Sequence, residues 1–227
     1  MKIKYKLEKV SNRIYHCIIN DPYDLAMTFC RVQEFYESPF KQIRGKSFEL
    51  LDFMRLYAKK NKEVYFGYPA DWSGFNIPGS IIQKCYYENN IIDENYYDDV
   101  IIEIHEKIMD ELDERDPRYY LIGSEGNNKI TKRHEIAHAL YHLNKDYKNK
   151  VDKVIKRITP KLYKHIEEYL LEIGYTKKVI VDEINAYFST EDSSIWESLE
   201  PTKKEEKLLN EVQTELSSLL REYELIK

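Results

Sequence analysis

The feature that most constrains the fold is a change in hydrophobic periodicity along the 227-residue chain. Residues 1–20 contain two short runs rich in β-branched and aromatic residues, separated by Ser11-Asn12, and this pattern predicts a pair of strands. From residue 128 onward the apolar residues recur at helical spacing. The sequence therefore predicts an α+β fold, with a small N-terminal sheet and a mainly helical C-terminal half. The helix that begins near residue 128 is expected to pack between them.

Turn and capping residues divide the rest of the chain into further elements. Strands are expected at 63–69 and 119–124, with an ordered loop over 69–80 that is rich in Pro, Gly and aromatic residues. That loop either faces a substrate or is a connection pinned by Trp72 and Phe75. Helices are expected after Pro22, at 47–60, 96–114 and 128–144, from about 151, and at 161–173, 176–188 and 203–226.

The last predicted helix has apolar residues alternately three and four positions apart. This heptad seam either docks on the body of the protein or joins copies of the chain, so an oligomer through this helix is possible. We therefore divide the chain into a catalytic domain, 1–192, and a linker with an amphipathic helix, 193–227. The seam consists of Leu209, Val212, Leu216, Leu219, Tyr223 and Ile226.

Composition excludes several classes of protein. A formal charge of -5 and a pI of about 5.8 argue against a nucleic-acid binder, which would carry a basic surface. The sequence has no apolar run close to the roughly 20 residues needed to cross a bilayer, so no membrane partner is expected. The N-terminus resembles no signal segment, which predicts a cytoplasmic protein. Three cysteines without a CxxC pair are expected to be reduced and mostly buried.

The segment His134-Glu135-Ile136-Ala137-His138 carries the strongest chemical signal. Two His residues four positions apart on a helix stand on one face, so both imidazoles can reach one metal ion. Glu135 lies just beside them, too far round the helix to be a comfortable ligand but well placed to take a proton from a metal-bound water. This is the HExxH arrangement of two ligands and a general base.

On these residues the chain resembles the zincin metallopeptidases, and specifically the gluzincin-like branch. The matching part is HEIAHAL and a downstream helix with a glutamate, about a quarter of the chain. The resemblance implies a zinc-dependent peptidase that acts on a peptide or protein substrate. It also implies an upstream sheet whose edge strand holds an extended substrate. The predicted strand 119–124 is either the candidate for that pairing or an interior strand.

The residues themselves point to Glu183 as the third ligand. Glu183 lies at the centre of an apolar helical stripe, where an unpaired carboxylate is costly and favours a cation. His142 continues the series but stands about 12 Å from His134 along a straight helix, too far to share the ion. The metzincin pattern needs a Gly turn and a further His after HExxH, but Tyr141 and Asn144 occupy the matching region. The deformylase pattern needs a Cys in an EGCLS-type segment, but Cys85 lies in IIQKCYYE. The segment reads DEINAY where the best-known gluzincins have NExxSD, and Asp182 or Asn185 is the candidate to orient a ligating His.

Transition-state stabilisation needs a donor aimed at the developing oxyanion, and either Tyr187 or Tyr141 could supply it. We assign Tyr187 to the site, although both phenols could instead be core residues. The sequence thus predicts a zinc metallopeptidase with Glu135 as base and His134, His138 and Glu183 as ligands. Two alternatives remain open, namely an HExxH hydrolase that cuts a non-peptide amide and a catalytically silent binding protein.

Overall fold

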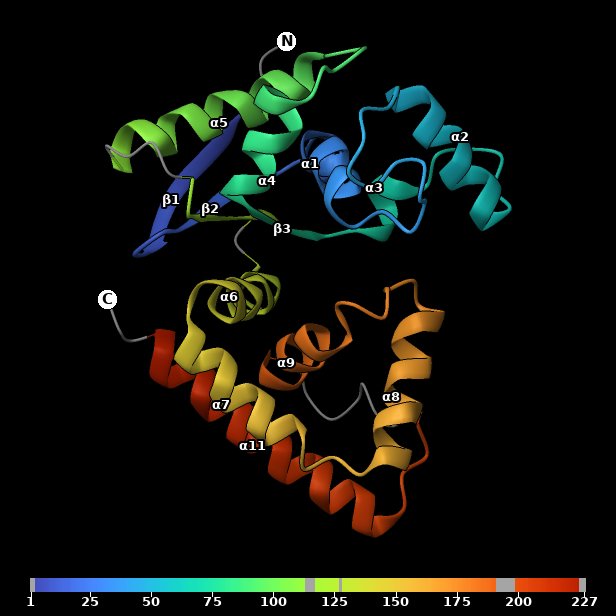
Figure 1. Ribbon diagram of the computed structural model, residues 1–227, viewed down its shortest axis with the longest axis vertical. Helices are drawn as coiled ribbons and strands as arrows, with labels where there is room; N and C mark the ends of the chain where they lie inside the picture. The colour runs from blue at the N-terminus through green and yellow to red at the C-terminus, as the bar shows by residue number, and fades with distance from the viewer. Residues whose placement is uncertain (1–2, 113–116, 127, 191–198, 225–227) are drawn as a thin grey trace. The chain divides into compact units, whose positions relative to one another are not determined.

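The computed structural model describes residues 3–112, 117–126, 128–190 and 199–224 (Figure 1). The chain forms two compact units, Met1–Lys132 and Arg133–Lys227. The predicted α+β class is confirmed, with the strands in the N-terminal half and a mainly helical C-terminal half. The division into 1–192 and 193–227 concerns function and stays a prediction.

The N-terminal unit contains a four-stranded mixed sheet in the order β1-β2-β4-β3. β1 pairs antiparallel with β2, β2 pairs parallel with β4, and β4 pairs antiparallel with β3. The strands are β1 (Tyr5–Ser11), β2 (Ile14–Ile19), β3 (Gly74–Pro78) and β4 (Tyr120–Glu125). The helices of this unit are α1 (Pro22–Glu37), α2 (Leu50–Asn61), α3 (Tyr68–Asp71), α4 (Gly79–Gln83), the π-helical turn η1 (Lys84–Glu88) and α5 (Tyr96–Leu112).

The expected substrate-pairing strand is interior to the sheet. β4 is hydrogen-bonded along both sides, to β2 and to β3, so its backbone has no open edge. Addition of a peptide strand requires such an edge, and the proposed pairing at 119–124 is therefore wrong. The strand was predicted at nearly the correct residues, but its neighbours follow from the sheet order and not from its own sequence.

The predicted strand at 63–69 is also wrong, and so is the loop at 69–80. α2 ends at Lys62 in a left-handed conformation, and the chain then runs to α3, where Pro69 occupies the first turn. Phe66 and Tyr68 stack on each other and both pack against Phe53, so side-chain packing and not strand pairing organises this segment. The supposed loop contains β3, the edge strand that ends at Pro78.

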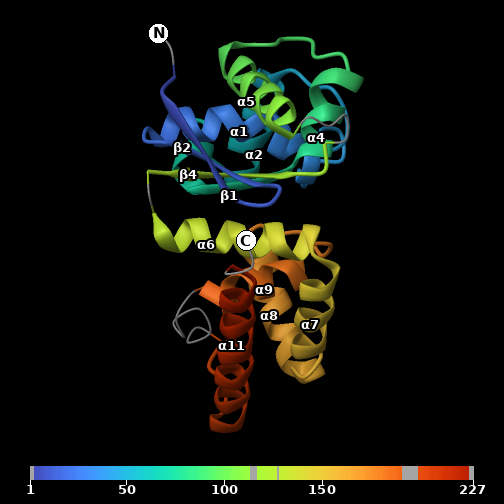
Figure 2. The same cartoon turned by 90° about the vertical axis from the view of Figure 1, so that its left-hand side faces the viewer.

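The core of the N-terminal unit lies between the sheet and helices α1 and α5, which lie on the same side of it (Figures 1 and 2). Phe29 of α1 is fully buried and stacks on Phe75 of β3 at 5.1 Å between ring centroids. A Cβ at Gly123 of β4 would come within 2.6 Å of the Phe29 ring, so only glycine permits this close approach. All three cysteines are buried and free, as predicted.

The C-terminal unit consists of helices. α6 (Lys129–Leu143) leads into it, followed by α7 (Lys145–Ile155), α8 (Pro160–Glu172), α9 (Ile180–Thr190) and α11 (Lys203–Glu224). α7 begins six residues before the predicted start at 151, because the Asn144 side chain caps its first turn. α9 begins at Ile180 and not at Thr176, since residues 177–179 form a separate turn.

The last helix docks on its own unit, packing beside α7 and α9 (Figures 1 and 2). Leu209, Val212, Leu216 and Tyr223 of the predicted seam are buried, but Leu220 takes the place assigned to Leu219. Ile226 lies outside the described residues. An oligomer joined through this helix stays a prediction. Among the helices of the described ranges, none has the length and apolarity to cross a membrane.

Candidate metal centre

The two imidazoles of the HExxH segment lie one turn apart on α6. The side chain of Asn128 caps the start of this helix by accepting from the backbone N–H groups of Ile130 and Thr131. The rings of His134 and His138 are 5.0 Å apart between centroids, in an edge-to-face arrangement. Local helix geometry therefore brings both rings to one place, as the spacing predicted.

Glu183 of α9 meets the histidine pair. Its Oε2 lies 3.9 Å from His134 Nε2 and 3.7 Å from His138 Nε2, and the three candidate ligand atoms all lie within 4.8 Å of one another. Tetrahedral zinc with bonds of about 2.0–2.1 Å separates its ligand atoms by about 3.4 Å. Glu183 Oε2 is within about half an ångström of that separation from both imidazole nitrogens, so the donor set fits zinc.

The charges around the rings favour a cation. Burial and the neighbouring His138 hold the pKa of His134 well below its ordinary value, so this ring is neutral and offers a lone pair. Burial alone would also lower the pKa of His138, but the carboxylates of Asp182 and Glu183 outweigh it and raise this pKa well above the ordinary value. The site thus carries negative charge that a bound divalent ion would neutralise.

Asp182 holds the second imidazole from behind. Its Oδ2 lies 3.1 Å from His138 Nδ1, the ring nitrogen opposite the one that faces Glu183. A carboxylate on the outer nitrogen of a ligating His fixes the ring and its tautomer. Of the two candidates for this role, Asp182 fills it, whereas the Asn185 amide donates to the backbone carbonyl oxygen of Ala137.

Glu135 is buried beside the histidine pair on α6. Its charge adds to the effect of other groups on His138 and Tyr175, whose pKa values are both raised, so the carboxylate lies near both side chains. Glu135 is not one of the three residues that could hold a metal ion (His134, His138 and Glu183, termed the metal-holding group), as its angular position on the helix predicted. This is the placement that a general base next to a metal requires.

Two tyrosines border the site. The ring of Tyr187 lies 4.7 Å from the ring of His134, and its hydroxyl lies 3.0 Å from the hydroxyl of Tyr175. One of the two phenols therefore donates to the other. Burial, followed by the charge of Glu183, raises the pKa of Tyr175 well above its ordinary value, so this phenol keeps its proton.

Tyr175 is the site residue that sequence reasoning missed. It follows the end of α8, where its N–H bonds to the Leu170 carbonyl and the N–H of Gly174 bonds to the Leu171 carbonyl. This is a Schellman motif, which requires a left-handed residue, and Gly174 has φ of +115°. Gly174 was correctly predicted to end the helix, but the direction in which the next residue points depends on the packing of α8 and α9.

Other polar side chains near the HExxH segment contact residues outside the candidate site or are exposed. The hydroxyl of Tyr141 donates to Asp152 on α7 at 2.7 Å, which makes it a poor oxyanion donor. Arg133 of α6 makes a two-pronged ion pair with Glu224 of α11 at 3.0 and 3.1 Å. His142 is exposed and outside the metal-holding group.

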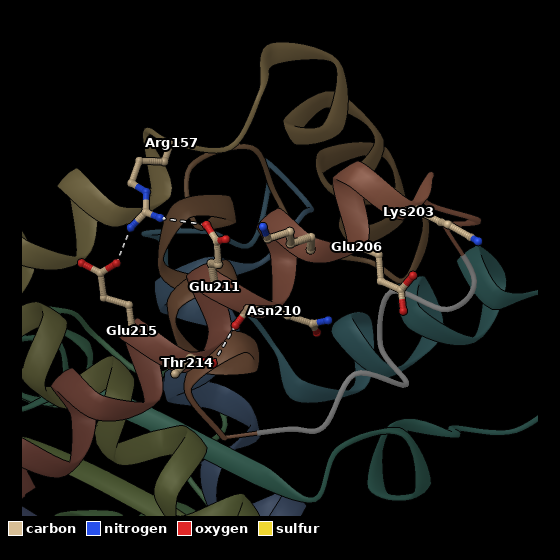
Figure 3. Close-up of a pocket in the computed structure, with 8 residues that line it drawn as sticks. Arg157, Lys203, Glu206, Asn210, Glu211, Thr214 and Glu215 are labelled. Carbon is tan, nitrogen blue, oxygen red and sulfur yellow. Dashed lines mark hydrogen bonds and ion pairs between the residues drawn. The ribbon is translucent and has the colours of Figure 1, made fainter.

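A hollow of about 830 Å³ elsewhere in the C-terminal unit has a different character. It runs along α11, and its eight lining residues are all exposed (Figure 3). Arg157 reaches across it to Glu211 and Glu215, so its charges are paired within the lining. These are features of a solvated helix face, and none of the lining residues belongs to the metal-holding group.

Comparison with known proteins adds no further assignment, because the chain matches no protein-family model, no curated protein and no solved structure.

Proposed function

We propose that this protein is a zinc-dependent metallopeptidase of the zincin type. The observation that carries the proposal is the convergence of His134, His138 and Glu183, whose ligand atoms lie within 4.8 Å of one another on two neighbouring helices. Two imidazoles and one carboxylate are the ligands of catalytic zinc in peptidases that keep a fourth position for water. Asp182 at His138 and the buried Glu135 add the supporting groups that such a site uses.

Each group of the site would have its own role in peptide-bond hydrolysis. A zinc ion held by the three ligands would polarise the scissile carbonyl and acidify a water molecule. Glu135 takes a proton from that water and passes it to the leaving amine. The Tyr187–Tyr175 pair supplies a hydroxyl donor to the carbonyl oxygen as negative charge develops there. The substrate would be a peptide or a protein.

Metal content and hydrolysis of an unfolded protein substrate, measured on the same preparations, test the proposal. We expect His134→Ala and Glu183→Ala to lose zinc and activity, because each removes a ligand. Glu135→Gln should keep zinc and lose activity, because it removes only the base. Glu168→Ala is the matched control, since Glu168 is an exposed glutamate on α8 paired with Lys164.

Three results would contradict parts of the proposal. Full zinc retention by Glu183→Ala would remove this residue from the ligand set. Unchanged turnover by Glu135→Gln would reject its role as base. A wild-type protein that binds zinc and cleaves no peptide would favour the alternatives of a non-peptide amidase or a silent binding protein.

A further inference from the structure

The Asn185 side chain joins three helices at the back of the metal site. It lies on α9, two residues after Glu183, and is fully buried. Its Nδ2 donates to the backbone carbonyl oxygen of Ala137 on α6 at 3.2 Å. Its Oδ1 accepts from the hydroxyl of Tyr147 on α7 at 2.9 Å and lies 3.4 Å from Ser189 Oγ.

The chemistry of these partners requires an amide at this position. A backbone carbonyl can only accept a hydrogen bond, so the nitrogen of the Asn185 amide must face Ala137. The oxygen must then face the Tyr147 hydroxyl, which donates to it. An aspartate would place a carboxylate oxygen against the carbonyl, and a leucine would remove one of the two side chains that the phenol bonds, leaving Ser189. The orientation of the amide follows from its partners.

Both residues of the Asn185–Ala137 hydrogen bond are close in sequence to proposed ligands. Ala137 immediately precedes His138, and Asn185 follows Glu183 by two residues. The link therefore ties the backbone of the helix that carries the histidines to the helix that carries the glutamate. Because zinc–ligand bonds tolerate only a few tenths of an ångström, the spacing of these two helices decides whether three side chains can share one ion.

We propose that Asn185 is a positioning residue that sets the spacing of α6 and α9 and so preorganises His138 and Glu183 for one ion. This inference rests on the proposed metal site and adds to it a residue that touches neither metal nor substrate. It differs from general core packing, because it assigns the effect on the metal to one hydrogen bond, from Asn185 to Ala137.

Zinc affinity of the full chain, measured by competition with a chelator, tests the proposal alongside urea unfolding. We expect Asn185→Leu to weaken zinc binding at least about tenfold, as loss of groups that orient metal ligands does. Tyr147→Phe removes one partner of the Asn185 oxygen and leaves the bond to Ala137, so its zinc affinity should equal that of wild type.

The double variant Asn185→Leu with Tyr147→Phe separates positioning from stability. It removes the buried hydroxyl that lost its Asn185 partner, so its stability should recover in part relative to Asn185→Leu alone. Its zinc affinity should stay low, because the bond to Ala137 is still absent. The d–d absorption of bound Co²⁺ should also broaden or shift in both leucine variants, since the ligand geometry is no longer held.

The results test the positioning role of Asn185 separately from the metal site itself. Weak zinc binding in both leucine variants supports the positioning role. Wild-type zinc affinity in the double variant would overturn it and leave the metal site intact. Failure of the wild-type protein to bind zinc would reject the metal site, and the positioning role with it.

Discussion

Replacing Asp182 should weaken metal binding by an amount that the geometry sets. Its Oδ2 lies 3.1 Å from His138 Nδ1, which is a charge-assisted hydrogen bond to a buried ring. The Asp182 side chain is 24 % exposed, so solvent partly screens its charge. We therefore expect Asp182→Asn to fall at the lower end of the range for such groups, about tenfold in zinc Kd or about 1.4 kcal/mol.

Two substitutions at Asp182 separate the orientation of the ring from the charge of the carboxylate. Asparagine keeps an acceptor oxygen and can still hold the ring, whereas Asp182→Ala loses both effects and should approach a hundredfold. Chelator competition at constant pH and ionic strength measures these constants. Asp152→Asn is the control, because it removes an equal charge from a carboxylate that accepts from Tyr141. Equal weakening in the Asp152 control, or wild-type affinity in both Asp182 variants, would refute the assigned role.

Three further predictions follow from the same structure. The double variant Tyr175→Phe with Tyr187→Phe should keep zinc and lower kcat about a hundredfold, as loss of an oxyanion donor does, because it removes both phenols of the pair; full activity of the double variant would reject the pair. Gly174→Ala (φ +115°) should cost about 1–2 kcal/mol in urea unfolding and also reduce activity by moving Tyr175, whereas Gly45→Ala (φ +71°) should cost stability alone. Burial raises the pKa of Glu34 to about 7 from 4.5, so the folded chain keeps this proton while the unfolded chain releases it, and stability should fall by about 3 kcal/mol as pH rises from 4.5 through 7. Glu34→Gln should remove that dependence in urea unfolding measured at pH 5 and pH 8, and an unchanged pH profile would contradict the assignment.

The sequence alone determined those features that depend on neighbouring residues. Two histidines four positions apart share a helix face wherever the helix forms, so His134 and His138 could be paired without a fold. The α+β class followed from periodicity, and the end of α8 followed from Gly174, since only a left-handed residue continues that turn. Glu183 was also found from its own helix, because a carboxylate at the centre of an apolar stripe needs a partner.

Only the tertiary structure decided which distant residues meet. The sheet order placed β4 between β2 and β3, and this removed the edge that a substrate strand would need. The packing of α8 and α9 turned Tyr175 toward Tyr187, and the packing of α6 and α9 brought Asn185 to the carbonyl of Ala137. The physical reason is that periodicity and capping act within a few residues, whereas these contacts depend on how separate helices and strands pack, which no local pattern encodes.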